Sequence, residues 1–309
     1  MSIIKVEDIA FVRFRAPDLA QMRAFLEDFG LACFEEGGRL YGRGTDGAPF
    51  VHATALGEPG FAGLAFRAGS RAELEALAAH DGATVEATGT PGGGFRVALR
   101  DPDGHSIEVV AEQARKSAEA SSADMAINTA HERRRLRETV RFAQGPSRVY
   151  RLGHAVLNVS DFARSEAWYK ERFGLITSDQ IEVQPGMPFG AFLRCDRGDT
   201  PTDHHTLFLL QAPSGPGFNH AAFEVCGLDD LMKGHTFLKS RNRQHAWGVG
   251  RHIFGSQIFD YWKDPWGNEL EHWTDGDLFT AADKPGVGGI PELLGAQWGP
   301  GFPGAPGPA

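Results

Sequence analysis

Two histidines and one glutamate in the second half of the sequence have the composition of a metal site. His154 and His220 each lie in a short apolar stretch, and Glu271 follows Gly267 by four residues. Because the three are far apart in the sequence, only the fold can bring them together. Two imidazoles and one carboxylate, with the remaining coordination positions open, form the facial triad of non-haem Fe(II) oxygenases. An open face of this kind would let an aromatic diol chelate the metal while dioxygen takes another position.

A second glutamate, Glu269, lies two residues before Glu271 and could also supply the carboxylate ligand. Glu269 and Glu271 would lie on the same face of a strand, because side chains alternate with a period of two. Spacing alone does not choose between them. An internal repeat does: Glu271 in DPWGNELEHW matches Glu108 in DPDGHSIEVV, and each follows a glycine by four residues. We therefore predict that Glu271 is the ligand.

A second internal repeat relates the two halves of the chain and predicts which elements position the candidate ligands. Residues 16–31 and 159–175 both contain an aspartate, an amphipathic run and a final Phe-Gly-Leu. Aspartate is a good helix N-cap and glycine a good helix stop. These features predict helices that begin after Asp18 and Asp161 and end at Gly30 and Gly174. A strand-like run precedes each helix, at residues 9–15 and 153–159.

Each half divides once more into the same order of elements. In the first half, we predict a strand at 61–68, a helix at 70–80 and three short strands between 84 and 110, separated by Gly/Pro turns. In the second half, we predict a strand at 218–225, a helix at 227–240 and strands at 251–262 and 268–273. The predicted fold is therefore α+β, with two domains that each contain two βαβββ modules.

The predicted domain boundaries follow from this order. The N-terminal domain spans residues 1–112, a charged, Ala-rich helical linker spans 113–148, and the C-terminal domain spans 149–280. Residues 281–309 form a tail dense in Gly and Pro, which disfavours regular helix or sheet. In the N-terminal domain, Phe11 and Gly63 stand where the histidines would be, and only Glu108 remains. We expect no metal there and a packing or interface role for that domain.

Composition narrows the classes of function. The 309 residues carry a net charge of -9, which argues against a nucleic-acid surface, since that requires a basic stripe. Three cysteines without a CxxC pattern predict neither a disulfide framework nor a cysteine metal site. No apolar run approaches the roughly 18 residues of a membrane span, and residues 1–8 do not look like a signal peptide. We expect a cytoplasmic protein.

Three segments resemble a known family. LGHAVLNVSD (152–161), FNHAAFEV (218–225) and YWKDPWGNELEHW (261–273) are similar to the type I extradiol ring-cleavage dioxygenases of the vicinal oxygen chelate superfamily, such as catechol 2,3-dioxygenase and 2,3-dihydroxybiphenyl 1,2-dioxygenase. The resemblance covers about residues 6–280 and is stronger after Tyr150. It implies two βαβββ modules per domain and Fe(II), with Mn(II) as an alternative, bound by His154, His220 and Glu271.

The same resemblance implies a reaction and an assembly. A catechol-type aromatic substrate would be opened by O2 beside its hydroxyls, as in aromatic hydrocarbon catabolism, by a homo-oligomer. In HHTLFLL the second histidine, His205, matches an acid/base residue that faces the metal, so His204 is expected to point away. GRHIFGSQIFDYW offers His252 and Tyr261, which match residues that orient the substrate or donate a hydrogen bond to it.

The remaining histidines and aromatics have no such match. We expect His235, His245 and His272 to be helix, loop and surface residues. Trp247, Phe189 and Phe192 could line a substrate pocket, although core packing is the simpler expectation for each.

Two other functions remain open on the sequence. One is another metal-dependent lyase or isomerase of the superfamily, similar to glyoxalase. The other is a metal-free small-molecule binding protein. A complete triad argues against the second, and the histidines clustered with Tyr261 favour ring cleavage over the first.

Overall fold

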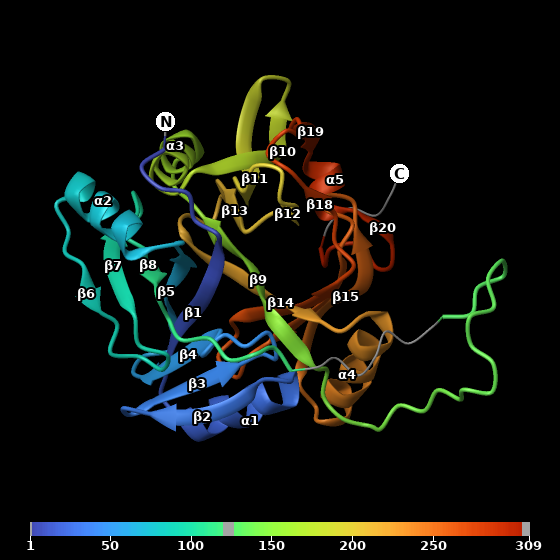
Figure 1. The fold of residues 1–309 in the computed structure, drawn as a ribbon. Coiled ribbons are helices and arrows are strands. Elements are labelled where there is room, and N and C mark those ends of the chain that lie inside the picture. The colour runs from blue at the N-terminus through green and yellow to red at the C-terminus, as the bar shows by residue number, and fades with distance from the viewer. Residues whose placement is uncertain (1, 120–126, 305–309) are drawn as a thin grey trace.

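Four copies of one strand–helix–strand–strand–strand unit build the protein, two in each half of the chain (Figure 1). The computed structural model describes residues 2–119 and 127–304. The α+β fold with paired βαβββ modules is therefore confirmed. The N-terminal pair consists of β1 (Asp8–Ala16), α1 (Leu19–Phe29), β2 (Ala32–Glu36), β3 (Arg39–Arg43), β4 (His52–Leu56), β5 (Gly60–Arg67), α2 (Arg71–Asp81), β6 (Glu86–Ala87), β7 (Phe95–Arg100) and β8 (Ser106–Ala111).

The C-terminal half repeats this order with one additional short strand, β12, and continues into four further elements. Its two modules consist of β9 (Val149–Asn158), α3 (Phe162–Phe173), β10 (Leu175–Gln184), β11 (Met187–Cys195), β12 (Thr202–Asp203), β13 (Leu207–Leu210), β14 (Gly217–Val225), α4 (Leu228–Ser240), β15 (Gln244–His252), β16 (Ile258–Lys263) and β17 (Glu269–Thr274). After them come β18 (Leu278–Phe279), β19 (Gly286–Gly289), α5 (Ile290–Leu294) and β20 (Ala296–Trp298).

The helix boundaries are set by local chemistry. The Asp18 side chain accepts a hydrogen bond from the backbone N–H of Gln21, and Asp161 accepts one from Arg164 in the same way. Such caps satisfy N–H groups that the first helical turn leaves without partners. Gly30 and Gly174 end the two helices in the left-handed conformation, as predicted.

The two sheets share a plan and a register. In each half, the first strands of the two modules pair antiparallel near the middle of the sheet, β1 with β5 and β9 with β14. Gly63 pairs with Arg13 as His220 pairs with Val156. On β5, Ala65 pairs with Phe11 on one side and Glu108 on the other. On β14, Ala222 pairs in the same way with His154 and Glu271. The predicted equivalence of these positions is therefore confirmed.

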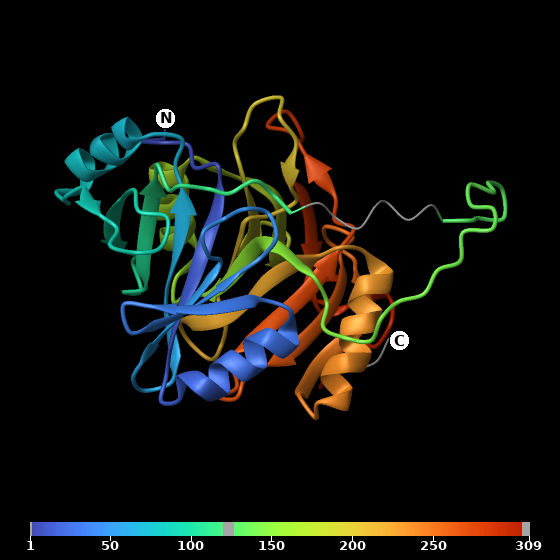
Figure 2. The same ribbon diagram turned by 60° about the horizontal axis from the view of Figure 1, so that its bottom comes forward.

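The linker differs from its prediction. Residues 113–119 and 127–148 contain no helix, and residues 120–126 lie outside the described part of the chain. In Figures 1 and 2 much of this segment extends away from the sheets. Leu136 is 84% exposed, so the segment lacks an apolar face against which a helix could pack. A short helix without tertiary packing is marginal in water, which explains why the helical prediction was wrong.

The tail also differs from its prediction, because it forms regular structure. β19 joins the edge strand β10, and β20 joins β15 at the other end of the same ten-stranded sheet. Glycine is what permits this packing at Gly288, where an added Cβ would lie 2.3 Å from the Phe254 ring. Pro291 stands in the first turn of α5, where a missing N–H costs nothing. The tail thus connects the two edges of the C-terminal sheet.

The two halves meet along a buried contact that corrects one prediction. His272, expected at the surface, is fully buried, and its Nε2 lies 2.7 Å from the carbonyl oxygen of Phe29 at the end of α1. Last-turn carbonyls need donors from outside the helix, so the imidazole completes this helix end. Arg243 pairs with Asp28 at 2.6 Å beside it. His245, expected in a loop, lies in β15, while His235 lies in α4 as predicted.

No helix in the described ranges has both the length and the apolar character needed to cross a bilayer.

Candidate metal centre

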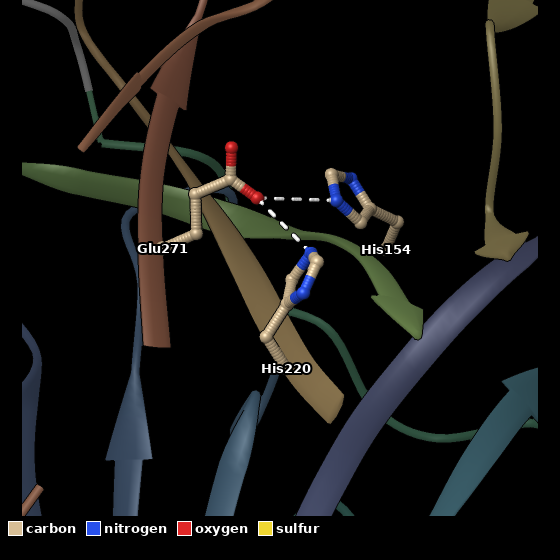
Figure 3. Close-up of side chains that lie close together, drawn as sticks. All are labelled: His154, His220 and Glu271. Atoms are coloured by element: carbon tan, nitrogen blue, oxygen red, sulfur yellow. Dashed lines mark ion pairs between the residues drawn. The ribbon is translucent and has the colours of Figure 1, made fainter. Parts of the chain in front are cut away.

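The three candidate ligands converge from three neighbouring strands (Figure 3). His154 lies on β9, His220 on β14 and Glu271 on β17. Each imidazole Nε2 lies 3.3 Å from the Oε2 atom of Glu271. Two ligand atoms bound at right angles to one ion at about 2.1 Å would be about 3 Å apart. The structure therefore brings all three predicted residues into the spacing that one metal ion requires.

The carboxylate of Glu271 is fully buried, yet neither of its oxygens accepts a hydrogen bond from the described residues. A metal cation beside this carboxylate would favour its ionised form. A buried charge without hydrogen bonds is costly unless a cation compensates it, so this environment fits a bound metal.

Both imidazoles are in a state that can bind a cation. Burial lowers the pKa of His154, so its ring is neutral at neutral pH. His220 Nδ1 lies 2.8 Å from Asn219 Oδ1, which can only accept a hydrogen bond. Nδ1 of His220 therefore carries the proton, and the lone pair on Nε2 faces Glu271. An outer partner that fixes the tautomer of a ligating histidine is typical of metal sites.

His205 lies beside the triad, and its neighbour His204 forms a hydrogen bond with it. The ring centres of His205 and His154 are 3.9 Å apart. His204 Nε2 donates to Asp179 Oδ2 at 2.6 Å, which leaves His204 Nδ1 to accept from His205 Nδ1 at 3.1 Å. His205 Nε2 is then the basic atom. His204 was expected to point away, and neither it nor Asp179 was predicted as part of the site.

His252 and Tyr261 complete the other side of the site. His252 Nε2 lies 3.1 Å from the Tyr261 hydroxyl and 3.6 Å from Oε1 of Glu271. Burial, followed by the negative charge of Glu271, raises the pKa of Tyr261 well above its usual value. The phenol therefore keeps its proton. When His252 Nε2–H donates to the Tyr261 oxygen, the phenol O–H is free to donate elsewhere.

A pocket borders these residues, and many of the other side chains that line it are apolar. Two of the aromatics for which core packing was the simpler expectation, Phe192 and Trp247, line it, whereas Phe189 packs against the neighbouring apolar cluster. The tail also contributes to the wall. The further apolar residues that line the pocket are Phe208, Leu210, Ile253 and Phe254, with Leu293, Leu294 and Phe302 from the tail.

The tail is anchored where it borders the pocket. Trp247 Nε1 donates to the carbonyl oxygen of Pro300 at 2.8 Å, and its ring lies edge-on to Phe302 with 5.3 Å between centres. Gln297 Nε2 donates to the backbone carbonyl oxygen of His252 at 2.9 Å. Tail residues thus contact two residues of the pocket directly. A Gly/Pro-rich composition gave no signal for this role.

The equivalent place in the N-terminal half is filled differently. Glu108 is buried and forms ion pairs with Arg13 at 2.5 Å and with Arg96 at 3.0 Å. Phe11 packs against Phe50 in a small apolar cluster. At Gly63, an added Cβ would lie 2.4 Å from the backbone oxygen of Ser106. Two guanidinium groups therefore neutralise the carboxylate that remains.

Part of the chain matches a known protein family. Residues 151–272 match the family described as the Glyoxalase/Bleomycin resistance protein/Dioxygenase superfamily. The matched segment runs from β9 to β17 and contains all three candidate ligands.

Two curated relatives match part of the chain. "Metapyrocatechase 2" of Cupriavidus necator is 32% identical over 50% of this chain and 45% of its own length. "Iron-dependent extradiol dioxygenase" of Rhodococcus jostii (strain RHA1) is 30% identical over 40% of this chain and 43% of its own length. The chain thus aligns with less than half the length of either relative.

The fold as a whole has solved counterparts. The Mn(II)-bound glyoxalase from Novosphingobium aromaticivorans superposes with a TM-score of 0.76 and covers 99% of this chain and 95% of its own, at 24% identity. At that identity the likeness shows the fold, which includes the N-terminal module pair.

Proposed function

Because residues 151–272 match the Glyoxalase/Bleomycin resistance protein/Dioxygenase superfamily, we propose that the chain is an extradiol dioxygenase. It would bind one divalent metal through His154, His220 and Glu271 and open a catechol-type ring with O2 beside the two hydroxyls. The observation that carries this proposal is the buried carboxylate of Glu271, which has an imidazole nitrogen at 3.3 Å on two sides and accepts no hydrogen bond from the part of the chain that the structure describes. Two curated relatives carry names of this activity, "Metapyrocatechase 2" and "Iron-dependent extradiol dioxygenase".

The donor set favours Fe(II). Two histidines and one carboxylate with open positions suit ferrous iron, and the same ligands accept Mn(II). One relative is named for iron and one structural neighbour contains Mn(II). When bound, such a metal supplies open positions for the diol and O2 and a route for electrons between them.

The protein's own residues would handle the protons. His205 lies beside the triad, with 3.9 Å between its ring centre and that of His154, and burial, aided by the neighbouring histidines, lowers the pKa of His205 well below its usual value. The imidazole is therefore neutral and can accept a proton from a diol hydroxyl and return it to a product oxygen. Tyr261 would donate its O–H to a substrate oxygen, with His252 holding the phenol in place.

The wall of the pocket favours a substituted diol. Its apolar side chains include Leu293 and Phe302 of the tail. They would contact an alkyl or aryl group on the ring and exclude water from the site. We therefore propose a catechol that carries an apolar substituent.

Oxygen uptake tests the function. The protein is purified without air, loaded with Fe(II) and mixed with catechol, an alkylcatechol and 2,3-dihydroxybiphenyl before air is admitted. We expect oxygen consumption together with a yellow ring-opened product. His154→Ala should bind no iron and consume no oxygen, whereas His80→Ala, a change at a partly exposed histidine on α2, should behave like the wild type. Stoichiometric metal without uptake for any diol would contradict ring cleavage.

A glyoxalase-like lyase is the second candidate, favoured by the likeness to the Mn(II)-bound glyoxalase over almost the whole chain. Such an enzyme consumes no dioxygen, and its chemistry does not require a tyrosine hydroxyl beside the metal. Turnover of a glutathione hemithioacetal without oxygen uptake would support it, and oxygen uptake with a diol would exclude it.

A further inference from the structure

A second group of metal-binding side chains lies on the opposite face of β16 from the candidate metal centre. Along this strand Tyr261 faces the centre, so Asp260 and Trp262 point the other way, toward α4. His235 on α4 and His245 on β15 converge on Asp260. This cluster shares no residue with the candidate centre.

The geometry of the cluster repeats that of the triad. Oδ1 of Asp260 lies 3.1 Å from Nδ1 of His235 and 2.9 Å from Nε2 of His245. The three ligand atoms lie within 4.8 Å of one another. Zn(II) binds imidazole nitrogen and carboxylate oxygen at about 2.0–2.2 Å, so ligands around it are about 3.3 Å apart in a tetrahedral arrangement. For the two carboxylate–imidazole pairs, shifts of a few tenths of an ångström would reach this spacing.

The environment of the Asp260 carboxylate suits a metal ligand. Asp260 is fully buried, and its Oδ2 accepts a hydrogen bond of 2.6 Å from Nε1 of Trp262. Burial alone would raise the pKa of Asp260, but its hydrogen bonds with His235 and His245 hold that pKa below its usual value. Oδ2, which also lies 3.0 Å from Nδ1 of His235, is held from outside by Trp262, as is common for ligating carboxylates, while Oδ1 faces both imidazoles.

Access and coordination number also fit. The side chains of His235 and His245 are 12% and 26% exposed, so an ion can reach them from solvent. Three protein ligands leave one tetrahedral position, which a water molecule can fill.

We propose that His235, His245 and Asp260 form a second metal site that binds Zn(II), with one position open to water. The ion would join α4 to the β15–β16 hairpin behind Tyr261. This inference does not depend on the function proposed for the first centre.

Counting bound zinc tests the proposal. The full-length chain is stripped with a chelator and dialysed against buffered ZnCl2, and zinc per chain is measured by mass spectrometry of the metal. We expect His245→Gln and His235→Gln each to bind one zinc fewer than the wild type. The matched control is His80→Gln, because His80 also lies beside a carboxylate, Asp81 at 3.4 Å, but without a second imidazole.

The difference of one zinc isolates this site from the first. His154→Ala removes a ligand of the candidate metal centre only, so His154→Ala/His245→Gln should bind one zinc fewer than His154→Ala. Far-UV circular dichroism checks that each variant is folded. The proposal is overturned if folded His245→Gln binds as much zinc as the wild type, or if a zinc-induced rise in Tm is the same in both.

Discussion

Asp179 lies on β10, outside the three candidate ligands, yet it governs the orientation of His205. Its carboxylate can only accept a hydrogen bond, so it fixes the proton of His204 on Nε2. His204 Nδ1 must then accept from His205, which leaves Nε2 of His205 as the base. The protonation pattern of the site therefore starts at Asp179, which makes it a positioning residue.

Asp179→Asn tests this chain of hydrogen bonds. An amide can donate to His204 Nε2, which would reverse the tautomers of both histidines. We expect kcat to fall roughly 10–100-fold, the range typical of changed outer partners in metal sites, with the iron content unchanged and the kcat–pH profile shifted. Asp199→Asn, at an exposed aspartate of the same half, is the control. Loss of iron from Asp179→Asn would instead indicate a structural role.

Only part of this site could be predicted from the sequence. His154, His220 and Glu271 lie in segments that repeat within the chain and resemble a family, so they could be found without coordinates. His204 and Asp179 were missed because their contact joins β10 to the short segment between β12 and β13, 25 residues further along the chain. Nothing local to either residue marks it.

At the scale of elements, the tail is the part whose role the sequence concealed. Helix boundaries at Asp18 and Asp161 could be predicted, because caps are local chemistry. β19 and β20 could not, because their strand pairing depends on edges formed by residues more than 40 positions away. The linker failed in the opposite direction. Its composition suits a helix, but residues 113–119 bond to the N-terminal half without forming one, and residues 127–144 are largely exposed.

Phe302→Ala should show what the tail contributes to substrate choice. Phe302 lines the pocket and is 42% exposed, so its removal forfeits about 1 kcal/mol of apolar contact with a bound substituent. We expect KM for an alkylcatechol or 2,3-dihydroxybiphenyl to rise about fivefold, with little change for catechol itself and no change in kcat. Steady-state kinetics on the three diols measure this.

The matched control for the tail is Val287→Ala. Val287 lies on β19 and is 64% exposed, and it does not line the pocket. It should leave all three KM values unchanged. An equal rise in KM for catechol and for the larger diols in Phe302→Ala would contradict a role in selecting the substituent.

At the scale of the whole molecule, buried neutral histidines tie stability to pH. His52 lies in the N-terminal half with 1% exposure, and burial lowers its pKa to about 3. In the unfolded chain its pKa would be about 6.5. Between these values the unfolded chain binds a proton that the folded protein does not, so the free energy of unfolding falls as the pH drops from 6.5 toward 3.

His52→Gln should flatten this dependence. A neutral side chain removes about 1.4 kcal/mol per pH unit of slope within that window. Urea denaturation at a series of pH values between 7 and 4 measures the slope, with His80→Gln, a partly exposed histidine, as the control. An unchanged slope in His52→Gln would show that acid sensitivity comes from other groups.

The glycine at position 63 has a consequence for ancestry. Restoring the metal set in the N-terminal half would require histidine in place of both Phe11 and Gly63. The backbone of Ser106 now occupies the space of a Cβ at residue 63, and two arginines hold Glu108. Phe11→His/Gly63→His should therefore unfold at a lower urea concentration and gain no iron. No single substitution would therefore give the N-terminal half the metal-binding set of the C-terminal half.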